Sequence, residues 1–255
     1  MTTDTPEWLP VASMPSRQIA VRRRAGQGTP ILWVGGFRSD MNSTKALALD
    51  ALAARLSHPM IRFDYAAHSE SPGQFKEMTL SDWLLDTLTV IDTLDDTPPV
   101  IVGSSMGGWI TLLAMREQHR LGKAPPKGLV LIAPAVDFTE ELMWNAFPDS
   151  VKRKITDEGV YHHPSAYGEP YPITKNFIED GRKHLMFGAP INPQASVHIL
   201  QGMKDPDVPV AHMQRLLDHM PETDVSVTYV KDGDHRLSRP EDIELLQRVV
   251  ERLLK

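Results

Sequence analysis

The chain has 255 residues, of which 41% are hydrophobic and 24% charged, and its formal net charge is −6. These values are typical of one large globular domain, and the negative charge argues against a nucleic-acid-binding protein. The absence of cysteine excludes disulfides, a thiolate nucleophile and zinc held by cysteine. The sequence contains no His-Glu-x-x-His motif, and no other motif implies a cofactor, so we expect neither a metal nor a cofactor.

The sequence gives no sign of a membrane or export segment. No apolar run approaches the roughly 18 residues that a membrane span needs. Residues 1–10 include Asp4 and Glu7 and lack the apolar stretch of a signal peptide, so we expect a cytoplasmic protein without a membrane span. The basic cluster Arg22-Arg23-Arg24 is short, and we interpret it as the solvated side of an edge strand rather than a phosphate-binding patch.

Short apolar segments predict a mainly parallel sheet. Residues 18–24 alternate in polarity and predict an antiparallel strand at the start of the sheet. Continuous apolar runs, which are typical of strands covered on both faces, follow at residues 31–34, 60–64, 100–102, 129–133 and 197–200. The last strand, 225–230, alternates and is rich in β-branched residues, which favours a place near the sheet edge.

Amphipathic helices are expected between these strands. Thr79-Leu80-Ser81-Asp82 resembles a capping box, residues 110–118 are compatible with a helix, and Ser238-Arg239-Pro240-Glu241 opens the last helix. Strands that alternate with helices over most of the chain predict an α/β fold with a mostly parallel, doubly wound sheet.

One segment, residues 137–190, lacks a clear strand and holds many aromatic residues and prolines. Because a structureless loop of this length is rare in a compact domain, we expect a small, mostly helical cap insertion. Residues 1–136 and 191–255 then form the core. Ordinary helices packed on the sheet edge are the alternative.

A candidate nucleophile follows the strand at residues 100–102. Gly103-Ser104-Ser105-Met106-Gly107 contains Gly-x-Ser-x-Gly between a strand and a helix, which is the context of a nucleophile elbow. Ser105 has a glycine two positions away on each side, whereas Ser104 does not. Ser105 is therefore the candidate nucleophile, and Ser104 a small residue that fits the turn.

Candidate partners for Ser105 follow two later strands. A serine nucleophile needs a base and an acid that orients it, and in this context the chain order is Ser, acid, His. Asp205 and Asp207 follow the strand at 197–200, and His235 follows the strand at 225–230. Since ligands bind at the carboxyl ends of parallel strands, these side chains can converge there. We favour Asp205, which comes sooner after its strand; Asp207 is the alternative acid or a helix cap. For His235, an exposed turn histidine is the alternative to a catalytic base.

Two backbone N–H groups are expected to bind the oxyanion of an ester reaction. One belongs to Met106, directly after the candidate nucleophile, and the other to Phe37, in the loop Gly35-Gly36-Phe37 after the strand at 31–34. A merely flexible turn at Gly35-Gly36 is the alternative.

These motifs together resemble the α/β-hydrolase superfamily from about Ile31 to the C-terminus. The stretch His68-Ser69-Glu70-Ser71 belongs to the same resemblance. Longer strings are similar to the branch of the mitochondrial acyl-protein (palmitoyl-protein) thioesterase that also cleaves acyl glucuronides: Gly36-Phe37-Arg38-Ser39-Asp40-Met41, Lys45-Ala46, Ile61-Arg62-Phe63-Asp64-Tyr65, residues 102–109, residues 200–205, and Asp234-His235-Arg236. The resemblance implies an α/β-hydrolase fold and places Ser105, Asp205 and His235 on the triad, which supports Asp205 over Asp207. Two departures are Gly35-Gly36 in place of the usual His-Gly and the absence of a counterpart to the targeting segment.

We therefore expect a serine hydrolase that cleaves carboxylic esters or thioesters through an acyl-enzyme. Its partner would be a small-molecule ester or acyl-thioester, and an acylated protein is a further candidate. A C–C bond hydrolase or lactonase with the same triad is the alternative enzyme, and a non-catalytic binding protein of this fold is the alternative from another class.

Overall fold

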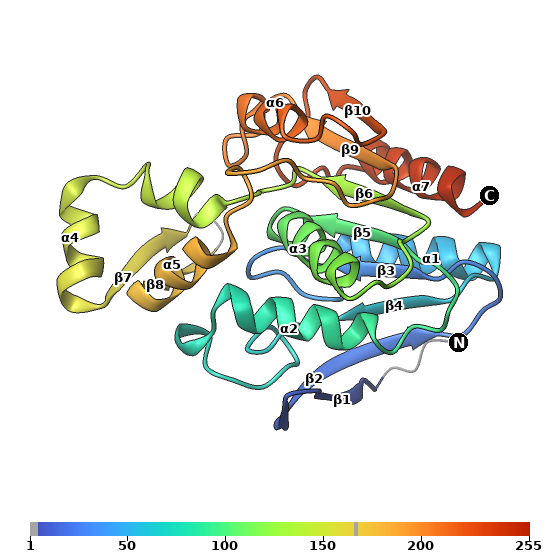
Figure 1. The fold of residues 1–255 in the computed structure, drawn as a ribbon, viewed down its shortest axis with the longest axis horizontal. Coiled ribbons are helices and arrows are strands. Elements are labelled where there is room, and N and C mark those ends of the chain that lie inside the picture. Colours follow the sequence, from blue (N-terminus) through green and yellow to red (C-terminus); the bar gives the residue numbers. More distant parts are fainter. Residues whose placement is uncertain (1–4, 166–167) are drawn as a thin grey trace.

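A computed structural model describes residues 5–165 and 168–255. Within these residues, eight strands form one sheet in the order β1-β2-β4-β3-β5-β6-β9-β10 (Figure 1). Their bounds are Glu7–Val11 (β1), Met14–Arg24 (β2), Ile31–Val34 (β3), Met60–Phe63 (β4), Val100–Ser104 (β5), Gly128–Ile132 (β6), Val197–Gly202 (β9) and Val225–Val230 (β10). From β4 to β10 all neighbours pair in parallel, whereas β1 and β2 are antiparallel. The expected doubly wound, mostly parallel sheet is confirmed.

Helices cover both faces of this sheet. Helices α1 (Thr44–Leu56) and α7 (Pro240–Leu254) contact each other on one face. Helices α2 (Leu80–Ile91), α3 (Met106–Arg120) and α6 (Val210–Asp218) lie on the other (Figure 1). Successive strand residues point to opposite faces, so Ile31 and Trp33 join the core under α1 and α7, while Leu32 and Val34 join the core under α2 and α3.

We had expected the basic cluster at the end of β2 to lie on an edge strand, but β2 is not at the edge of the sheet. Strand β1 pairs with β2 and forms the edge instead. Arg22 is buried and binds Glu70 (2.6 Å), Arg23 binds Glu7 (3.0 Å), and Arg24 binds Asp50 (2.6 Å). The three guanidinium groups thus link β2 to neighbouring elements rather than pointing freely into solvent.

The segment 137–190 leaves the sheet after β6 and forms the lobe at the left of Figure 1. It contains a π-helix (Thr139–Trp144), α4 (Asp149–Glu158), the antiparallel strands β7 (Val160–Ser165) and β8 (Gly168–Thr174), α5 (Lys175–Gly181) and a 3₁₀ helix (Arg182–His184). The expectation of a segment without strands is wrong at β7 and β8. Each strand of a two-stranded sheet has an open edge, so Pro164, Pro170 and Pro172 need not donate a ladder hydrogen bond.

A buried carboxylate joins the two ends of this segment. Asp137 accepts hydrogen bonds from the backbone N–H groups of Met186 (2.8 Å) and Phe187 (2.9 Å), almost fifty residues later. Asp180 in α5 accepts bonds from the N–H and hydroxyl of Ser81 at the start of α2 (2.8 and 2.9 Å). The lobe is therefore attached to the sheet domain by polar contacts to named backbone groups as well as by apolar packing.

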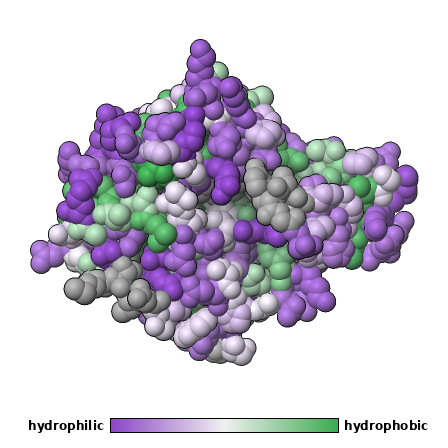
Figure 2. Space-filling view, turned by 180° about the vertical axis from the view of Figure 1, so that it is seen from behind, coloured by the Kyte–Doolittle hydropathy of each residue, from purple (hydrophilic) through white to green (hydrophobic). Residues whose placement is uncertain are grey.

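The face seen in Figure 2 is mainly hydrophilic, and its hydrophobic side chains lie in small separate areas. In the described part of the chain, no helix combines the length and the apolar character that crossing a membrane requires.

Candidate active site

Ser105 lies in a tight turn between β5 and α3. Its backbone has φ 54° and ψ −119°, a conformation that is strained for a residue with a side chain. The turn is possible because its flanking residues are glycines. A Cβ atom on Gly107 would lie 2.1 Å from the carbonyl oxygen of Val34, and one on Gly103 would lie 2.6 Å from that of Gly107. The strand, the turn and the helix thus form the elbow that the sequence predicts.

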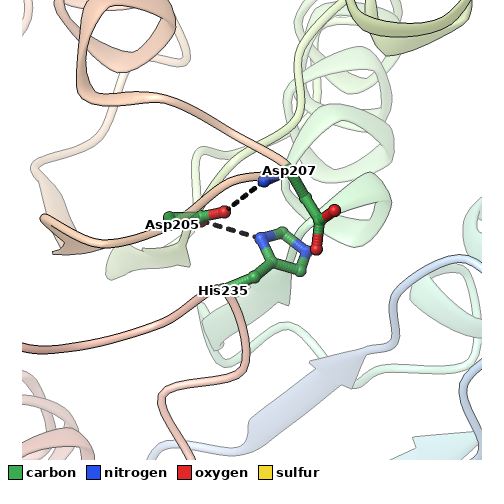
Figure 3. A group of neighbouring side chains, drawn as sticks. All are labelled: Asp205, Asp207 and His235. Carbon is green, nitrogen blue, oxygen red and sulfur yellow. Dashed lines mark hydrogen bonds and ion pairs between the residues drawn. The ribbon is translucent and has the colours of Figure 1, made fainter. Parts of the chain in front are cut away.

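The three candidate catalytic side chains form one hydrogen-bonded chain. The Ser105 hydroxyl lies 3.0 Å from His235 Nε2, and His235 Nδ1 lies 2.8 Å from Asp205 Oδ2 (Figure 3 shows the second contact). The Asp205 side chain is fully buried, and its other oxygen accepts the N–H groups of Asp207 and Val208, both at 2.8 Å. These contacts hold the carboxylate in one orientation toward the imidazole.

Asp207 lies beside the imidazole but contributes only its backbone N–H to this network (Figure 3). It does not cap α6 either, because Pro209 occupies that position without a side-chain hydrogen bond. Among the described residues, Asp205, Asp207 and His235 are the group whose ligand atoms lie close enough to hold a metal, all within 4.8 Å. Two of the three are already bonded to each other, so the group is accounted for without an ion.

Hydrogen bonds within the loop and one contact from helix α1 hold the loop that carries His235. The carboxylate of Asp234 accepts the N–H groups of Arg236 (3.1 Å) and Leu237 (3.0 Å). Lys45 of α1 donates from its ammonium group to the carbonyl of Arg236. Burial, together with the nearby positive charge of Arg236, lowers the pKa of Lys45 to about 8. Arg236, the residue directly after His235, is therefore anchored to helix α1.

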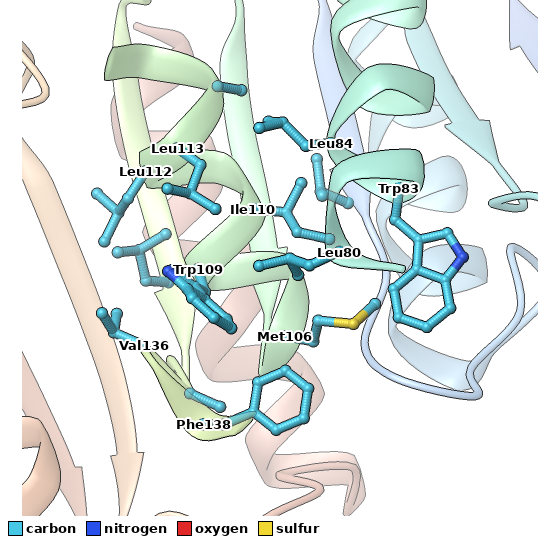
Figure 4. Close-up of a cluster of buried hydrophobic side chains, with 14 of the residues drawn as sticks. Leu80, Trp83, Leu84, Met106, Trp109, Ile110, Leu112, Leu113, Val136 and Phe138 are labelled. Atoms are coloured by element: carbon cyan, nitrogen blue, oxygen red, sulfur yellow. The ribbon is translucent and has the colours of Figure 1, made fainter. Parts of the chain in front are cut away.

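The two residues whose N–H groups are expected to bind an oxyanion line the same cavity as Ser105. Phe37 and Met106 both line that cavity, and in the described part of the chain neither N–H is used in a turn or loop hydrogen bond. The side chain of Met106 is fully buried between α2 and α3 (Figure 4). This burial fixes the first turn of α3, so the N–H of Met106 keeps its direction.

A buried histidine supports the loop that carries Phe37. The backbone N–H of Arg38, the next residue, donates to His68 Nε2 (3.1 Å), and His68 Nδ1 lies 3.3 Å from the carbonyl of Ala66. Burial lowers the pKa of His68 to about 4, so the ring is neutral and its proton is on Nδ1. The hydroxyl of Tyr65 donates to the carbonyl of Gly35 (3.0 Å) in the same loop.

Ser105 and His235 open into a cavity of about 570 Å³ between the sheet edge and the lobe. Its apolar wall combines core and lobe residues: Met106, Ala135, Phe138, Leu142, Met143 and Val208. His163 of β7 also lines it, and its Nδ1 atom is buried without a hydrogen-bond partner among the described residues. The geometry provides a nucleophile with a base, two free N–H donors and room for an apolar group.

Comparison with known proteins agrees with this geometry. The model of the alpha/beta hydrolase family matches residues 28–244. The chain belongs to the α/β-hydrolase family. The human palmitoyl-protein thioesterase ABHD10, mitochondrial, is 34% identical over 98% of this chain and 84% of the relative.

Two solved structures extend the likeness to the whole fold. A protein from Agrobacterium vitis S4 described as a hydrolase is 40% identical, with a TM-score of 0.93 and full coverage of both chains. The mouse alpha/beta hydrolase domain-containing protein 10 is 31% identical, with a TM-score of 0.87 over 98% of each chain. The similarity to the branch of the palmitoyl-protein thioesterases is thus confirmed.

The expected cytoplasmic location of this hydrolase is contradicted. The curated relatives from five mammals, which are 31% to 35% identical, are all named as mitochondrial proteins. The composition of residues 1–10, on which the expectation was based, is therefore not a guide to where a member of this branch works.

Sequence reasoning missed the residues that support the catalytic loops of this α/β hydrolase. His68, Lys45 and Arg38 all lie in strings that carry the family resemblance, but no spacing rule assigns them a role. His68 is 30 residues from its partner Arg38, and Lys45 is 191 residues from Arg236. Of the three, His68 is buried, and burial is visible only in the folded chain, so the sequence offered no signal for these roles.

Proposed function

We propose that the protein is a serine hydrolase that cleaves carboxylic esters or thioesters through an acyl-enzyme. The observation that carries this proposal is the uninterrupted chain from the Ser105 hydroxyl through His235 to the buried carboxylate of Asp205. The protein's membership of the α/β-hydrolase family and the names of its thioesterase relatives support the same type of reaction.

Asp205 determines which nitrogen of His235 acts as the base. The carboxylate accepts the proton of Nδ1, so the lone pair of the neutral ring is on Nε2 and faces Ser105. The two N–H groups that bind the other oxygen of Asp205 prevent the carboxylate from turning away from His235. The carboxylate also stabilises the imidazolium that forms when the serine loses its proton.

The reaction proceeds in two halves. In the first, Ser105 Oγ attacks the carbonyl carbon, its proton moves to His235 Nε2, and the N–H groups of Phe37 and Met106 bind the oxyanion. The carbon–oxygen or carbon–sulfur bond then breaks, and His235 returns the proton to the leaving group. In the second half, His235 takes a proton from water and the hydroxide attacks the carbonyl carbon of the acyl-enzyme. The bond from this carbon to Ser105 Oγ then breaks, His235 returns the proton to Oγ, and the acid is released.

The apolar wall of the cavity favours a substrate with an apolar acyl group. Half of this wall comes from the segment 137–190, which contributes Phe138, Leu142 and Met143. We therefore propose that residues 137–190 form a cap that selects the acyl group over the reactive serine. The name of the relatives as palmitoyl-protein thioesterases supports a long-chain acyl thioester as the first substrate to test.

The proposal is tested with a fluorophosphonate probe, which reacts with an activated serine and not with a resting hydroxyl. We expect labelling of the native protein and of Ser104→Ala, the matched control in the preceding position. We expect no labelling of Ser105→Ala and turnover reduced by at least about 10³-fold. Labelling that persists in Ser105→Ala would show that another residue is the nucleophile.

A further inference from the structure

A second hollow adjoins the cavity of Ser105. It has a volume of about 420 Å³ and is lined by Ser39, Asp40, His68 and Ser69 among others. Arg38 and Tyr171 line both spaces and so form the wall that they share. The apolar wall of the first cavity fits an acyl group, and the polar side chains of the hollow can contact a polar leaving group.

The side chain of Arg38 is exposed and contacts the ring of Tyr171 at this shared wall. Its backbone N–H is bound to His68, and its guanidinium lies over the ring of Tyr171 at 4.5 Å. Stacking of this kind fixes the plane of a guanidinium but uses none of its five N–H donors. The donors of Arg38 are therefore positioned directly after the residue that supplies one of the oxyanion N–H groups.

Arg38 differs from the other arginines that stack on aromatic rings. Arg182 lies over Trp144 (4.8 Å) and also binds Glu140 (2.7 Å), and Arg215 lies over Phe187 (4.4 Å) and also binds Glu141 (2.7 Å). Among the described residues, Arg38 has no such carboxylate partner. Asp40 lines the same hollow, but its carboxylate accepts the N–H of Asn42 (2.8 Å) instead.

We propose that Arg38 binds an anionic group, a carboxylate or a phosphate, on the leaving group of the substrate. The inference rests on the proposed ester or thioester hydrolysis and narrows its substrate class. A guanidinium with free donors at the wall of a cavity is the side chain that best recognises such planar or tetrahedral anions. The tie between Arg38 and His68 places this anion site at a fixed position relative to the oxyanion donors.

The test compares two pairs of substrates, each with an anionic and a neutral member that share the same acyl group. One pair is 4-(butyryloxy)benzoate and 4-(butyryloxy)benzamide, and the other is butyryl-CoA and S-butyryl-N-acetylcysteamine. The readout is the ratio of kcat/KM for the anionic to that for the neutral member, measured on one preparation. This ratio does not depend on the fraction of folded enzyme. Arg38→Met removes the charge, Arg38→Lys keeps it, and Arg182→Met removes the matched stacked arginine outside the cavity.

We expect the ratio to fall roughly 10- to 100-fold in Arg38→Met, mainly through KM, because a charge-assisted hydrogen bond is lost. In Arg38→Lys the ratio should lie between those of the native protein and Arg38→Met, and Arg182→Met should keep the native ratio. A fall confined to the benzoate pair identifies a carboxylate site, and a fall confined to the CoA pair identifies a phosphate site. An unchanged ratio in Arg38→Met, or an equal fall in Arg182→Met, would overturn the proposal. Fluorophosphonate labelling reports Ser105 independently, so failure of the nucleophile and failure of this site are distinguishable.

Discussion

The loops at the carboxyl edge of the sheet and the segment 137–190 line the same cavity, but different interactions fix them. Ser105 directly follows β5, and Asp205 and His235 lie three and five residues after the ends of β9 and β10, so the strand pairing sets the positions of all three. The segment 137–190 has its own two-stranded sheet and is held by buried polar contacts, of which Asp137 and Asp180 make the clearest.

This difference separates the chemistry from the choice of substrate. A residue set by a sheet of eight strands keeps its place when the surrounding loops change, whereas the lobe depends on a few contacts and can vary in shape. We therefore expect substitutions at the sheet edge to lower kcat for every substrate. Substitutions in the lobe should change stability or substrate preference instead.

The largest effect is expected at the acid of the triad. Asp205→Asn should lower kcat by about 10⁴-fold for all esters, because the amide no longer holds the proton on His235 Nδ1. Asp207→Asn is the matched control two residues away, and it should lower kcat less than about tenfold. Steady-state kinetics with a short-chain aryl ester measure both. Equal losses in the two variants would show that the geometry does not identify the acid.

A smaller effect, on stability, is expected where the lobe is attached. Asp137→Ala should lower the free energy of unfolding by about 3 to 4 kcal/mol, because the N–H groups of Met186 and Phe187 lose a buried carboxylate partner. Asp149→Ala, an exposed change in the first turn of α4, is the control and should cost less than about 1 kcal/mol. Urea unfolding measures both values. If the two variants prove equally stable, the ends of the lobe are held by other contacts.

The buried His68 should make stability depend on pH. Its pKa is lowered to about 4 in the folded protein, so between about pH 4 and pH 6.5 the unfolded chain binds more protons than the folded one. Stability should therefore rise with pH across this window, by at most about 3 kcal/mol from this residue. In His68→Gln that contribution should be absent.

The measurement for His68 is the difference between the stability–pH curves of the native protein and the variant. Burial raises the pKa of Asp64 and of Asp86 to about 6, which acts in the opposite direction between about pH 4 and 6, but both residues are present in both proteins. Their contributions cancel in the difference. Two parallel curves would mean that His68 is not held neutral beside Arg38.

The smallest effect is expected at the apolar wall of the cavity. Leu142→Ala enlarges the cavity on the side that the lobe supplies. It should therefore change the preference between short and long acyl chains by roughly fivefold, or about 1 kcal/mol. The readout is kcat/KM for a series of acyl esters of increasing length. The same factor at every chain length would place Leu142 outside the acyl-binding wall.

The sequence predicted the sheet and the three converging side chains well because both follow from local rules. Apolar runs identify buried parallel strands, and residues directly after those strands must meet at one edge. The glycines around Ser105 are required by contacts of 2.1 and 2.6 Å that any elbow of this shape would make. The ends of the parallel strands differed from the prediction by at most two residues, as at Val100–Ser104, whereas the antiparallel strand β2 begins four residues before its predicted start.

What the sequence did not predict depends on contacts between distant segments. Pro10 in β1 and Pro164, Pro170 and Pro172 in β7 and β8 disfavour strands by local rules, yet all three strands are open at an edge and accept them. The roles of Lys45 and His68 arise from partners that only the folded chain brings together. Such supporting residues leave no periodic pattern that could be read in advance.

The account is tested most directly by trapping the acyl-enzyme. The protein is mixed with a 4-nitrophenyl ester, quenched in acid within the first turnover, digested and analysed by mass spectrometry. We predict that one acyl group is attached and that it lies on the peptide containing Ser105. Hydrolysis that continues without any acylated peptide, or an acyl group on another residue, would contradict the proposed mechanism.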